Sequence, residues 1–406
     1  MHEPRLEPSQ AAVGVPAVEA GELLCERGAL VIDLRSPAEF EEDHVPGAVN
    51  VPLFDDAQRA IVGTLYRKES PESAFAEGRE IVAARITELC ARIAQLAGES
   101  LPAADLAARV REATAGGIEQ LESAVAPRTM SALPDRPVVL HCWRGGLRSR
   151  SVVWLLRTLG FERAVALRGG YRSWRAEVLR GIEGWQAPPA YVLRGLTGVG
   201  KTLVLRELER IRPGWTIDLE GHAGHRSSLL GGVGLEPVSQ KRFESRLFER
   251  LRALSMNAAP VVVFEGESRK VGDVILPGPI WRALSGGVNL ELVADTQRRI
   301  AVLKADYLAA RGSTQELARI LPAIESRMQR AAGDPALAEL LGTGRVDELV
   351  ALLLEHYYDP LYRHSQQGKK YAVRIDAAEP ARAAREIASW IESRPPTEEQ
   401  PSSRLG

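Results

Sequence analysis

The amino-acid sequence predicts an α/β protein with two domains, each built on a parallel β-sheet. Short apolar runs typical of buried strands alternate with segments whose apolar residues recur at helical spacing. This alternation is typical of a parallel sheet that helices cover on both faces. The chain has 406 residues, which is long for one domain and enough for two separate cores. We assign residues 12–180 to the first domain, 181–190 to a proline-containing linker, 191–392 to the second domain and 393–406 to a disordered tail.

The composition indicates a protein of a reducing compartment. Apolar residues make up 45% of the chain and charged residues 26%, as in ordinary soluble proteins. No apolar run approaches the ~20 residues of a membrane helix, and the N-terminus "MHEPRLEPSQ" lacks the basic start and apolar middle of a signal peptide. Cys25, Cys90 and Cys142 are too few and too scattered for a disulfide framework or a zinc site. We therefore expect a cytoplasmic protein with reduced thiols and no membrane contact.

The charge of the chain makes no overall case for a nucleic-acid partner, because the formal net charge is only −1. The basic residues are nonetheless mostly arginine, whose planar group bonds phosphate bidentately and stacks on RNA bases. An RNA-binding surface and the base composition of the genome both explain this preference, and composition alone leaves both open.

The first domain opens with a strand at 30–34, a short helix and a second strand at 48–51. Ser36 is a suitable cap for that helix, with proline at the first helical position. Between residues 73 and 125 apolar and charged residues alternate at helical spacing with two interruptions, which predicts two or three helices. The strand "RPVVLHC", an amphipathic helix ended by Gly160 and the strand "RAVALRGG" complete the domain.

The second domain opens with "YVLRGLTGVGKTLVLRELERI", which predicts a strand, a glycine-rich loop and a helix. The apolar run in "VVVFEGES" predicts a later buried strand. Helical patterns follow from about residue 300 to residue 356, and "YAVRID" predicts a last strand.

The stretch "VVLHCWRGGLRSRS" places Cys142 directly after a strand, at the sheet edge where ligands of α/β proteins bind. The backbone N–H groups of the loop and the N-terminus of the next helix form an anion-holding nest, to which Arg144 and Arg148 add positive charge. We expect these features to lower the pKa of Cys142 below its usual ~8.5. The loop could hold an oxyanion, or a persulfide or selenosulfide on the sulfur. An inert cysteine of the core is the structural alternative.

The stretch "GLTGVGKT" satisfies the phosphate-loop pattern G-x-x-x-x-G-K-[ST] between a strand and a helix. Gly195, Gly198 and Gly200 let backbone N–H groups approach phosphate oxygens. Lys201 reaches the outer phosphate, and Thr202 can bind Mg²⁺. We therefore predict a phosphate site at this loop.

Acidic residues follow two other strands of the second domain. Glu265 ends an apolar run, where an acidic residue often helps to hold Mg²⁺ through water, although phosphate-loop proteins more often have aspartate there. Asp218 and Glu220 end the strand "WTIDLE", either near the phosphate or as helix caps. His222 and His225 lack a third ligand for a metal site. We expect no tightly bound cofactor, with Mg²⁺ at Thr202 and Glu265 as the one ion that the pattern suggests.

Three stretches, "IDLRSPAEFEEDHVPGAVNVP", "HCWRGGLRS" and "LRGGYRSW", resemble the opening, active loop and closing turn of a rhodanese domain. The resemblance implies that Cys142 carries a transferable chalcogen atom. Four residues of the opening motif are expected to fix the fold: Asp33, Arg35, His44 and Gly47. The five residues between Cys142 and Arg148 also resemble phosphatase relatives of this fold, so a phosphatase is one alternative.

Further motifs resemble the second half of the bacterial tRNA 2-selenouridine synthase family. They are "DLEGHAGHRSSLLGG", "QKRFESRLFERL", "FEGESRKVGDVILP" and "YYDPLY", and "HCWRGGLRS" is that family's form of the active loop. The resemblance extends over residues 30–387, within which the segment 98–125 looks longer than the family's helical insert. The fold it implies is a rhodanese-like domain followed by a phosphate-loop (P-loop NTPase-like) domain.

The resemblance implies a transferase that replaces the sulfur of a wobble 5-substituted 2-thiouridine with selenium, in tRNAs with Lys, Glu and Gln anticodons. Selenophosphate would be the selenium donor and its producing enzyme a protein partner. Geranyl diphosphate would first alkylate the sulfur and make it a leaving group.

We expect Cys142 to take or present selenium, and infer that the loop with Lys201 grips the diphosphate, because neutralising its charge makes it a better leaving group. The alternatives are an ATP-dependent tRNA sulfurtransferase or kinase with a rhodanese domain, and a non-catalytic protein in which both motifs only bind.

Overall fold

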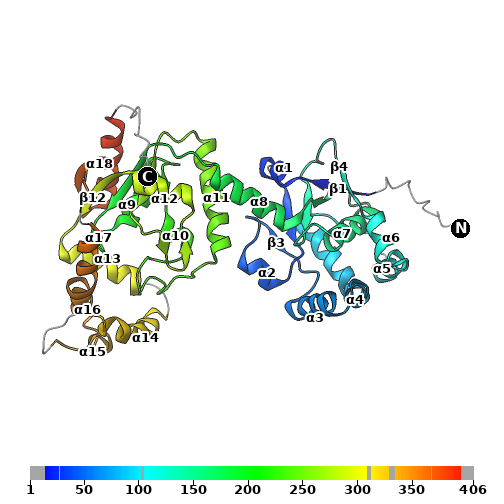
Figure 1. Cartoon of the computed structure of the whole chain (residues 1–406), viewed down its shortest axis with the longest axis horizontal. Helices are drawn as coiled ribbons and strands as arrows, with labels where there is room; N and C mark the ends of the chain where they lie inside the picture. The colour runs from blue at the N-terminus through cyan, green and yellow to red at the C-terminus, as the bar shows by residue number, and fades with distance from the viewer. Residues whose placement is uncertain are drawn as a thin grey trace, which may run out of the picture. The chain divides into compact units, whose positions relative to one another are not determined.

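The computed structural model of the chain (Figure 1) describes residues 14–26, 28–101, 105–308, 312–328, 334–366 and 368–394. Residues 12 and 13 of the predicted first domain, and most of the predicted tail, lie outside the described residues. The chain divides into two compact units, Met1–Arg180 and Gly181–Gly406, which we call the first and second units. Each unit contains a parallel sheet with helices packed on it, so the predicted fold class is confirmed.

The first unit contains a six-stranded sheet in the order β3-β2-β5-β6-β1-β4, in which every pair is parallel. Its strands are β1 (Val15–Val18), β2 (Leu30–Asp33), β3 (Val49–Asn50), β4 (Pro127–Thr129), β5 (Val138–His141) and β6 (Ala164–Leu167). Strand β5 lies inside the sheet, and all four of its residues are buried. The loop that follows β5 therefore starts from a rigid position.

The helices of the first unit are α1 (Ala20–Cys25), α2 (Pro37–Glu42), α3 (Asp56–Lys68), α4 (Pro71–Ala97), α5 (Leu106–Ala113), α6 (Gly117–Ala124), α7 (Leu147–Thr158) and α8 (Gly170–Glu183). Ser36 caps α2 in a capping box, with proline at the first helical position, as predicted. Helices α4, α5 and α6 confirm the prediction of two or three helices between residues 73 and 125. Helix α3 is not among the predicted elements. None of its residues is fully buried, and Ile61 and Tyr66 are exposed, so its apolar residues do not form the core-facing stripe by which a helix is usually recognised.

The second unit contains a five-stranded parallel sheet in the order β13-β12-β7-β9-β8. Its strands are β7 (Ala190–Arg194), β8 (Thr216–Ile217), β9 (Val262–Glu265), β12 (Val288–Val293) and β13 (Val373–Asp376), and a separate antiparallel hairpin pairs β10 (Lys270–Val271) with β11 (Val274–Ile275). Helix α8 continues to Glu183, so the connection to β7 comprises residues 184–189, which is shorter than the predicted linker. Strand β7 is the central strand, with β12 and β9 as its neighbours.

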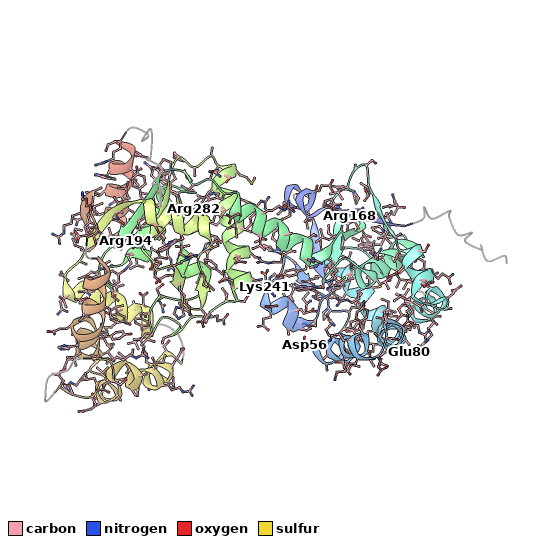
Figure 2. All side chains as sticks on the ribbon, in the orientation of Figure 1. Asp56, Glu80, Arg168, Arg194, Lys241 and Arg282 are labelled. Carbon is pink, nitrogen blue, oxygen red and sulfur yellow. The ribbon has the colours of Figure 1, made fainter. Side chains whose placement is uncertain are left out.

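The helices of the second unit are α9 (Lys201–Ile211), α10 (Leu219–Ala223), α11 (Gln240–Met256), α12 (Gly278–Gly286), α13 (Thr296–Leu308), α14 (Ser313–Glu325), α15 (Leu337–Gly342), α16 (Val346–Leu353), the π-helix η1 (Leu354–Tyr358), α17 (Asp359–Gln366) and α18 (Pro380–Glu392). Figure 2 shows the side chains, among them Asp56 on α3 and Arg194 at the end of β7. Among the described helices, none has the length and apolar character needed to cross a membrane.

Candidate functional site

The cysteine loop connects β5 to α7 in the first unit. Cys142 follows β5 directly, is 2% exposed, and has its Sγ 3.4 Å from the Oγ of Ser149. The start of α8 packs against the loop, because Tyr171 N–H donates to the carbonyl of Cys142 at 2.9 Å. Gly170 has φ +60°, and a Cβ there would lie 2.3 Å from the Cys142 carbonyl oxygen, so only glycine fits. The position of Cys142 is thus fixed by the starts of both following helices, α7 and α8.

The pKa of the Cys142 thiol is lowered, as predicted. Burial alone would raise this pKa, but the charge of Arg148 and hydrogen bonds from the Ser149 hydroxyl and the backbone N–H groups of Ser149 and Gly146 outweigh it. Arg144, the other predicted arginine, is exposed and lines a hollow next to Cys142. The loop thus favours the thiolate. Ser149 was not predicted, because a serine at the start of a helix is too common to be a signal.

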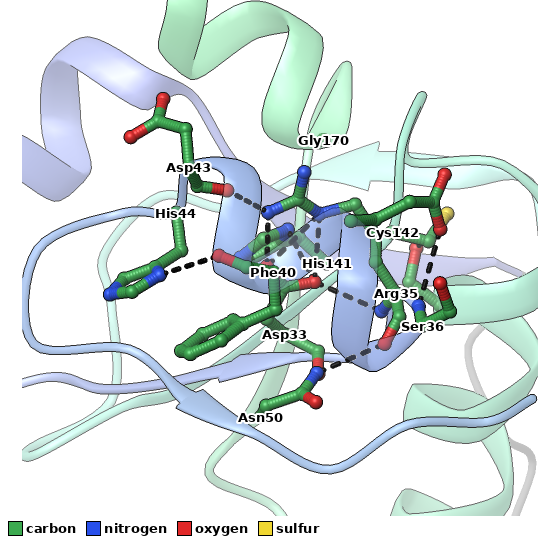
Figure 3. A network of polar contacts seen from close by, with 12 residues as sticks. Asp33, Arg35, Ser36, Phe40, Asp43, His44, Asn50, His141, Cys142 and Gly170 are labelled. Atoms are coloured by element: carbon green, nitrogen blue, oxygen red, sulfur yellow. Dashed lines mark hydrogen bonds and ion pairs between the residues drawn. The ribbon is translucent and has the colours of Figure 1, made fainter. Parts of the chain in front are cut away.

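The residues of the opening motif form a buried network of polar contacts next to Cys142 (Figure 3). Arg35 and Asp33 form a buried ion pair at 2.6 Å, with side chains 1% and 0% exposed. Arg35 also donates to the carbonyl of Asp43 at 2.7 Å and lies 3.8 Å over the ring centroid of Tyr171. Asn50 donates to the carbonyls of both Asp33 and Arg35. These contacts bind β2, β3 and α8 together, which supports the structural role expected for Asp33 and Arg35.

The two other residues expected to fix the fold lie at the end of α2 and in the turn before β3. His44 Nδ1 is 2.8 Å from the carbonyl of Phe40, and its ring stacks on that of Phe40 with centroids 3.7 Å apart. Gly47 has φ +78°. His141, which precedes Cys142, is fully buried 3.7 Å from Asp33, and burial lowers its pKa despite that neighbour. His141 is therefore neutral at neutral pH.

The phosphate loop connects β7 to α9 in the second unit. Gly195, Gly198 and Gly200 all have positive φ, and a Cβ at Gly198 would lie 2.9 Å from the Arg299 carbonyl oxygen. Lys201 begins α9, and its Nζ donates to the carbonyl of Gly195 at 3.3 Å. The loop therefore curls around the lysine ammonium group, the arrangement that cradles phosphate.

Thr202 and Glu265, the predicted metal residues, are in contact. The Thr202 hydroxyl donates to Oε2 of Glu265 at 2.8 Å, and the backbone N–H of Glu220 donates to Oε1 at 3.1 Å. The parallel register places Leu193 of β7 opposite Glu265 of β9, which brings the carboxylate to the phosphate loop. A hydroxyl and a carboxylate are oxygen ligands of the kind that Mg²⁺ takes together with substrate phosphates, so this pair fits the ion.

Two carboxyl groups act on Lys201, those of Glu220 and Glu267, and the buried Glu265 accepts from the backbone N–H of Glu220 beside them. Burial raises the pKa of each, and their mutual repulsion adds to the effect for Glu220 and Glu265. The pKa of Lys201 is raised because Tyr362, Glu267 and Glu220 outweigh its burial. Glu267 and Tyr362 were not predicted. Glu267 lies two residues beyond the strand end, whereas Tyr362 reaches the loop only in the folded chain.

Two further polar residues from the sequence analysis, Asp218 and His222, lie at the start of α10 and within it. Asp218 caps α10 by accepting from the backbone N–H of Gly221 at 2.6 Å, which is the capping alternative. His222 lies in α10, where burial lowers its pKa. Among the described residues no group of three or more His, Cys, Asp or Glu is arranged to hold a metal ion.

Arg299 supports the phosphate loop from α13. Its Nε donates to the carbonyl of Thr197 at 2.8 Å, and its outer nitrogens bind the carboxylate of Asp359 at 3.1 and 2.5 Å. Asp359 belongs to the motif "YYDPLY", and Tyr362 of the same motif has its ring centroid 5.2 Å from Lys201 Nζ. This C-terminal motif therefore forms one side of the phosphate site.

Comparison with protein families identifies both units. Residues 17–88 and 103–177 match the model of the rhodanese-like domain. Residues 188–325 match the model described as the tRNA 2-selenouridine synthase AAA domain.

Relatives match over most of the chain. A tRNA 2-selenouridine synthase of Bordetella petrii is 30% identical over 84% of this chain and 88% of its own length. The protein of that name in Chromohalobacter salexigens is 30% identical, over 84% of this chain and 89% of the relative. The protein of that name in Pseudomonas fluorescens is 29% identical, also over 84% of this chain and 89% of the relative. The chain belongs to the tRNA 2-selenouridine synthase family.

Proposed function

We propose that this protein replaces the sulfur of a wobble 5-substituted 2-thiouridine in tRNA with selenium, through an S-geranylated intermediate. The observation that carries the proposal is the presence of two separate anion sites in one chain of this family. One surrounds a thiolate-forming cysteine, and the other is a phosphate loop. Selenophosphate and geranyl diphosphate are the co-substrates, and tRNAs with Lys, Glu and Gln anticodons are the targets. The reaction takes place in the cytoplasm, where the selenophosphate-producing enzyme is a partner.

The phosphate loop performs the geranyl transfer in this proposal. Lys201 and the backbone N–H groups bind the diphosphate of geranyl diphosphate. Thr202 and Glu265 would hold Mg²⁺, which supplies charge neutralisation of that diphosphate. The 2-thio sulfur then forms a bond to the allylic carbon, the carbon–oxygen bond breaks, and diphosphate leaves with the electron pair. The charge of Lys201 acts on the oxygens where negative charge develops.

The cysteine loop performs the selenium step. Cys142 presents selenium that stays at the selenide level of selenophosphate, and Arg148 keeps that site favourable to anions. The selenium of selenophosphate bonds to C2 of the uridine, the C2–sulfur bond breaks, and geranylthiolate leaves with the electron pair and takes up a proton. Water then cleaves the selenium–phosphorus bond and releases phosphate. Arg144 is exposed beside this site, where it can bind the phosphodiester backbone of the tRNA.

Mass spectrometry of wobble nucleosides tests the proposal. In a strain that makes both modified nucleosides, deletion of the gene should remove selenouridine and S-geranyl-2-thiouridine, and the wild-type gene should restore both. Unchanged levels of both nucleosides after deletion would overturn the proposal. Binding measurements with ATP and geranyl diphosphate distinguish it from an ATP-dependent sulfurtransferase or kinase, which would bind the nucleotide at the phosphate loop.

A further inference from the structure

A large hollow opens beside Cys142 in the first unit. Its volume is about 1230 Å³, which is above the ~300–1,000 Å³ of typical small-molecule sites. Cys142 and the loop after it line one side, and residues of α2, α3, α4, α5, α6 and α7 line the others. The hollow belongs entirely to the first unit, so it is distinct from the phosphate site of the second unit.

The walls of the hollow are mainly apolar. Several apolar side chains that line it pack only partly against the core of the first unit: Val62, Phe75, Val82, Val110, Leu147 and Trp154. Tyr66 on α3 also lines it and is 62% exposed. Apolar surface that a monomer leaves open in a concave site indicates an apolar ligand, because covering it removes that surface from water.

The hollow also has charged side chains of both signs, and two of its arginines lie at the cysteine end. Five arginines line it, namely Arg59, Arg67, Arg79, Arg144 and Arg148, against four carboxylates, namely Glu39, Asp56, Glu119 and Glu122. Arg59 lies 3.6 Å from Glu39 and Arg79 lies 2.9 Å from Glu80, so these two arginines are paired. Arg144 and Arg148 lie on the cysteine loop itself. A ligand fits this lining if its apolar part contacts the apolar walls and an anionic group next to it contacts Arg144 and Arg148.

We propose that the hollow binds the geranyl chain of S-geranyl-2-thiouridine while C2 of that base lies at Cys142; this inference rests on the function proposed above. The chain is attached to the sulfur that is bonded to C2, so it must lie close to the cysteine whenever C2 reacts there. The apolar walls receive the chain, and the phosphodiester flanking the base lies at the arginines. The smaller cavity at the phosphate loop, about 500 Å³, is lined by Lys201, Arg194, Arg226 and Glu267 among others, and suits the diphosphate instead.

Gly78 offers a means of filling the hollow. It lies in α4, is buried, and lines the hollow. A Cβ there would lie 3.5 Å from Cζ of Phe54, which is an ordinary contact, so the backbone accepts a side chain and a leucine would extend into the hollow. Ala76 lies on the same helix but is exposed and is not part of the lining. Ala76→Leu is therefore a matched control that adds the same side chain outside the hollow.

The first test measures binding of the nucleoside S-geranyl-2-thiouridine to the full-length protein. Gly78→Leu should raise its Kd at least tenfold, whereas Ala76→Leu should leave it at the wild-type value. Equal Kd values for the wild type and a folded Gly78→Leu protein would overturn the proposal. The alkylation rate of Cys142, followed by peptide mass spectrometry, should be the same in all three proteins, which shows that the cysteine loop is intact.

The second test measures selenation of anticodon stem–loops that carry either an S-geranyl or an S-methyl group. Gly78→Leu should raise KM for the S-geranyl RNA at least tenfold and leave KM for the S-methyl RNA unchanged. Equal changes for both RNAs would show that the hollow does not recognise the chain and would overturn the inference. If the wild type selenates neither RNA, the proposed function fails, and the Kd comparison still decides whether the hollow binds a geranyl chain.

Discussion

Arg299 Nε donates to the carbonyl oxygen of Thr197 at 2.8 Å, and this bond holds the phosphate loop from outside. The arginine side chain is 6% exposed and is held in turn by Asp359, whose side chain is 15% exposed. A buried charge pair with bidentate geometry gives orientation as well as attraction. Asp359 is thus a positioning residue for a loop that precedes it by more than 150 residues of sequence.

Asp359→Asn should destabilise the second unit and distort the phosphate loop. Removing one partner of a buried ion pair leaves an uncompensated charge and costs about 3–5 kcal/mol of unfolding free energy. We expect KM for geranyl diphosphate to rise more than kcat falls, because Lys201 itself is unchanged. Denaturant unfolding and steady-state kinetics measure the two effects. The double variant Arg299→Met, Asp359→Leu should recover the wild-type free energy of unfolding but not the low KM for geranyl diphosphate. Recovery of both would show that the pair does not position the loop.

Cys142→Ser should abolish selenium incorporation and leave geranyl transfer largely intact, because a hydroxyl does not form the thiolate that presents selenium and the phosphate loop is untouched. Cys90→Ser is the internal control. Cys90 is buried in α4, and burial raises the pKa of its thiol to about 12, so it is not nucleophilic near neutral pH. Per folded molecule, Cys90→Ser should selenate tRNA at the wild-type rate. Equal loss of both activities in folded Cys142→Ser would contradict the assignment of two separate sites.

The alkylation rate of Cys142 should depend on pH in a way that Arg148 controls. The thiolate is the reactive form, so the rate with iodoacetamide rises as pH rises through the pKa and is constant above it. Because the pKa of Cys142 is lowered, the midpoint should lie below that of an ordinary cysteine. Arg148→Gln removes the largest of the favourable influences and should move the midpoint to higher pH. An unchanged midpoint in a folded variant would show that the hydrogen bonds alone stabilise the thiolate.

Lys201→Ala should stop geranyl transfer, and with it the selenation of ordinary 2-thiouridine tRNA. By analogy with the loss of one preorganised donor, kcat should fall about 10²–10³-fold. Supplying tRNA that is already geranylated should restore selenation, since the later step uses Cys142. If that tRNA is bound but stays unreacted, the phosphate loop also serves the selenium step, and its occupant is then selenophosphate or a nucleotide.

The two anion-binding loops could be predicted because each is a contiguous pattern next to a strand. Cys142 and Lys201 are recognisable from their neighbours in the sequence, and Glu265 from the apolar run before it. Three site residues could not be recognised in this way, because they contact Cys142 or Lys201 only in the folded chain: Ser149, Glu267 and Tyr362. Arg299 meets Thr197 across 102 residues, and no local periodicity encodes such a contact.

The hollow beside Cys142 could not be predicted for a related reason. A sequence pattern identifies which face of a helix is apolar, but it does not reveal whether that face is covered. Helices α3 and α4 leave part of their apolar surface open toward the cysteine loop, and only the packing of the first unit shows this.

The carboxyl groups near the phosphate loop should couple ligand binding to proton uptake. Glu220, Glu265 and Glu267 already have raised pKa values, and a bound diphosphate would raise them further by repulsion. The complex therefore holds more protons than the free protein, so measured without divalent metal, the affinity for diphosphate should fall as pH rises. Calorimetry in buffers of different ionisation enthalpy would count those protons. Binding of an anion beside Lys201 would thus be accompanied by protonation of the acids that face it, Glu220 and Glu267.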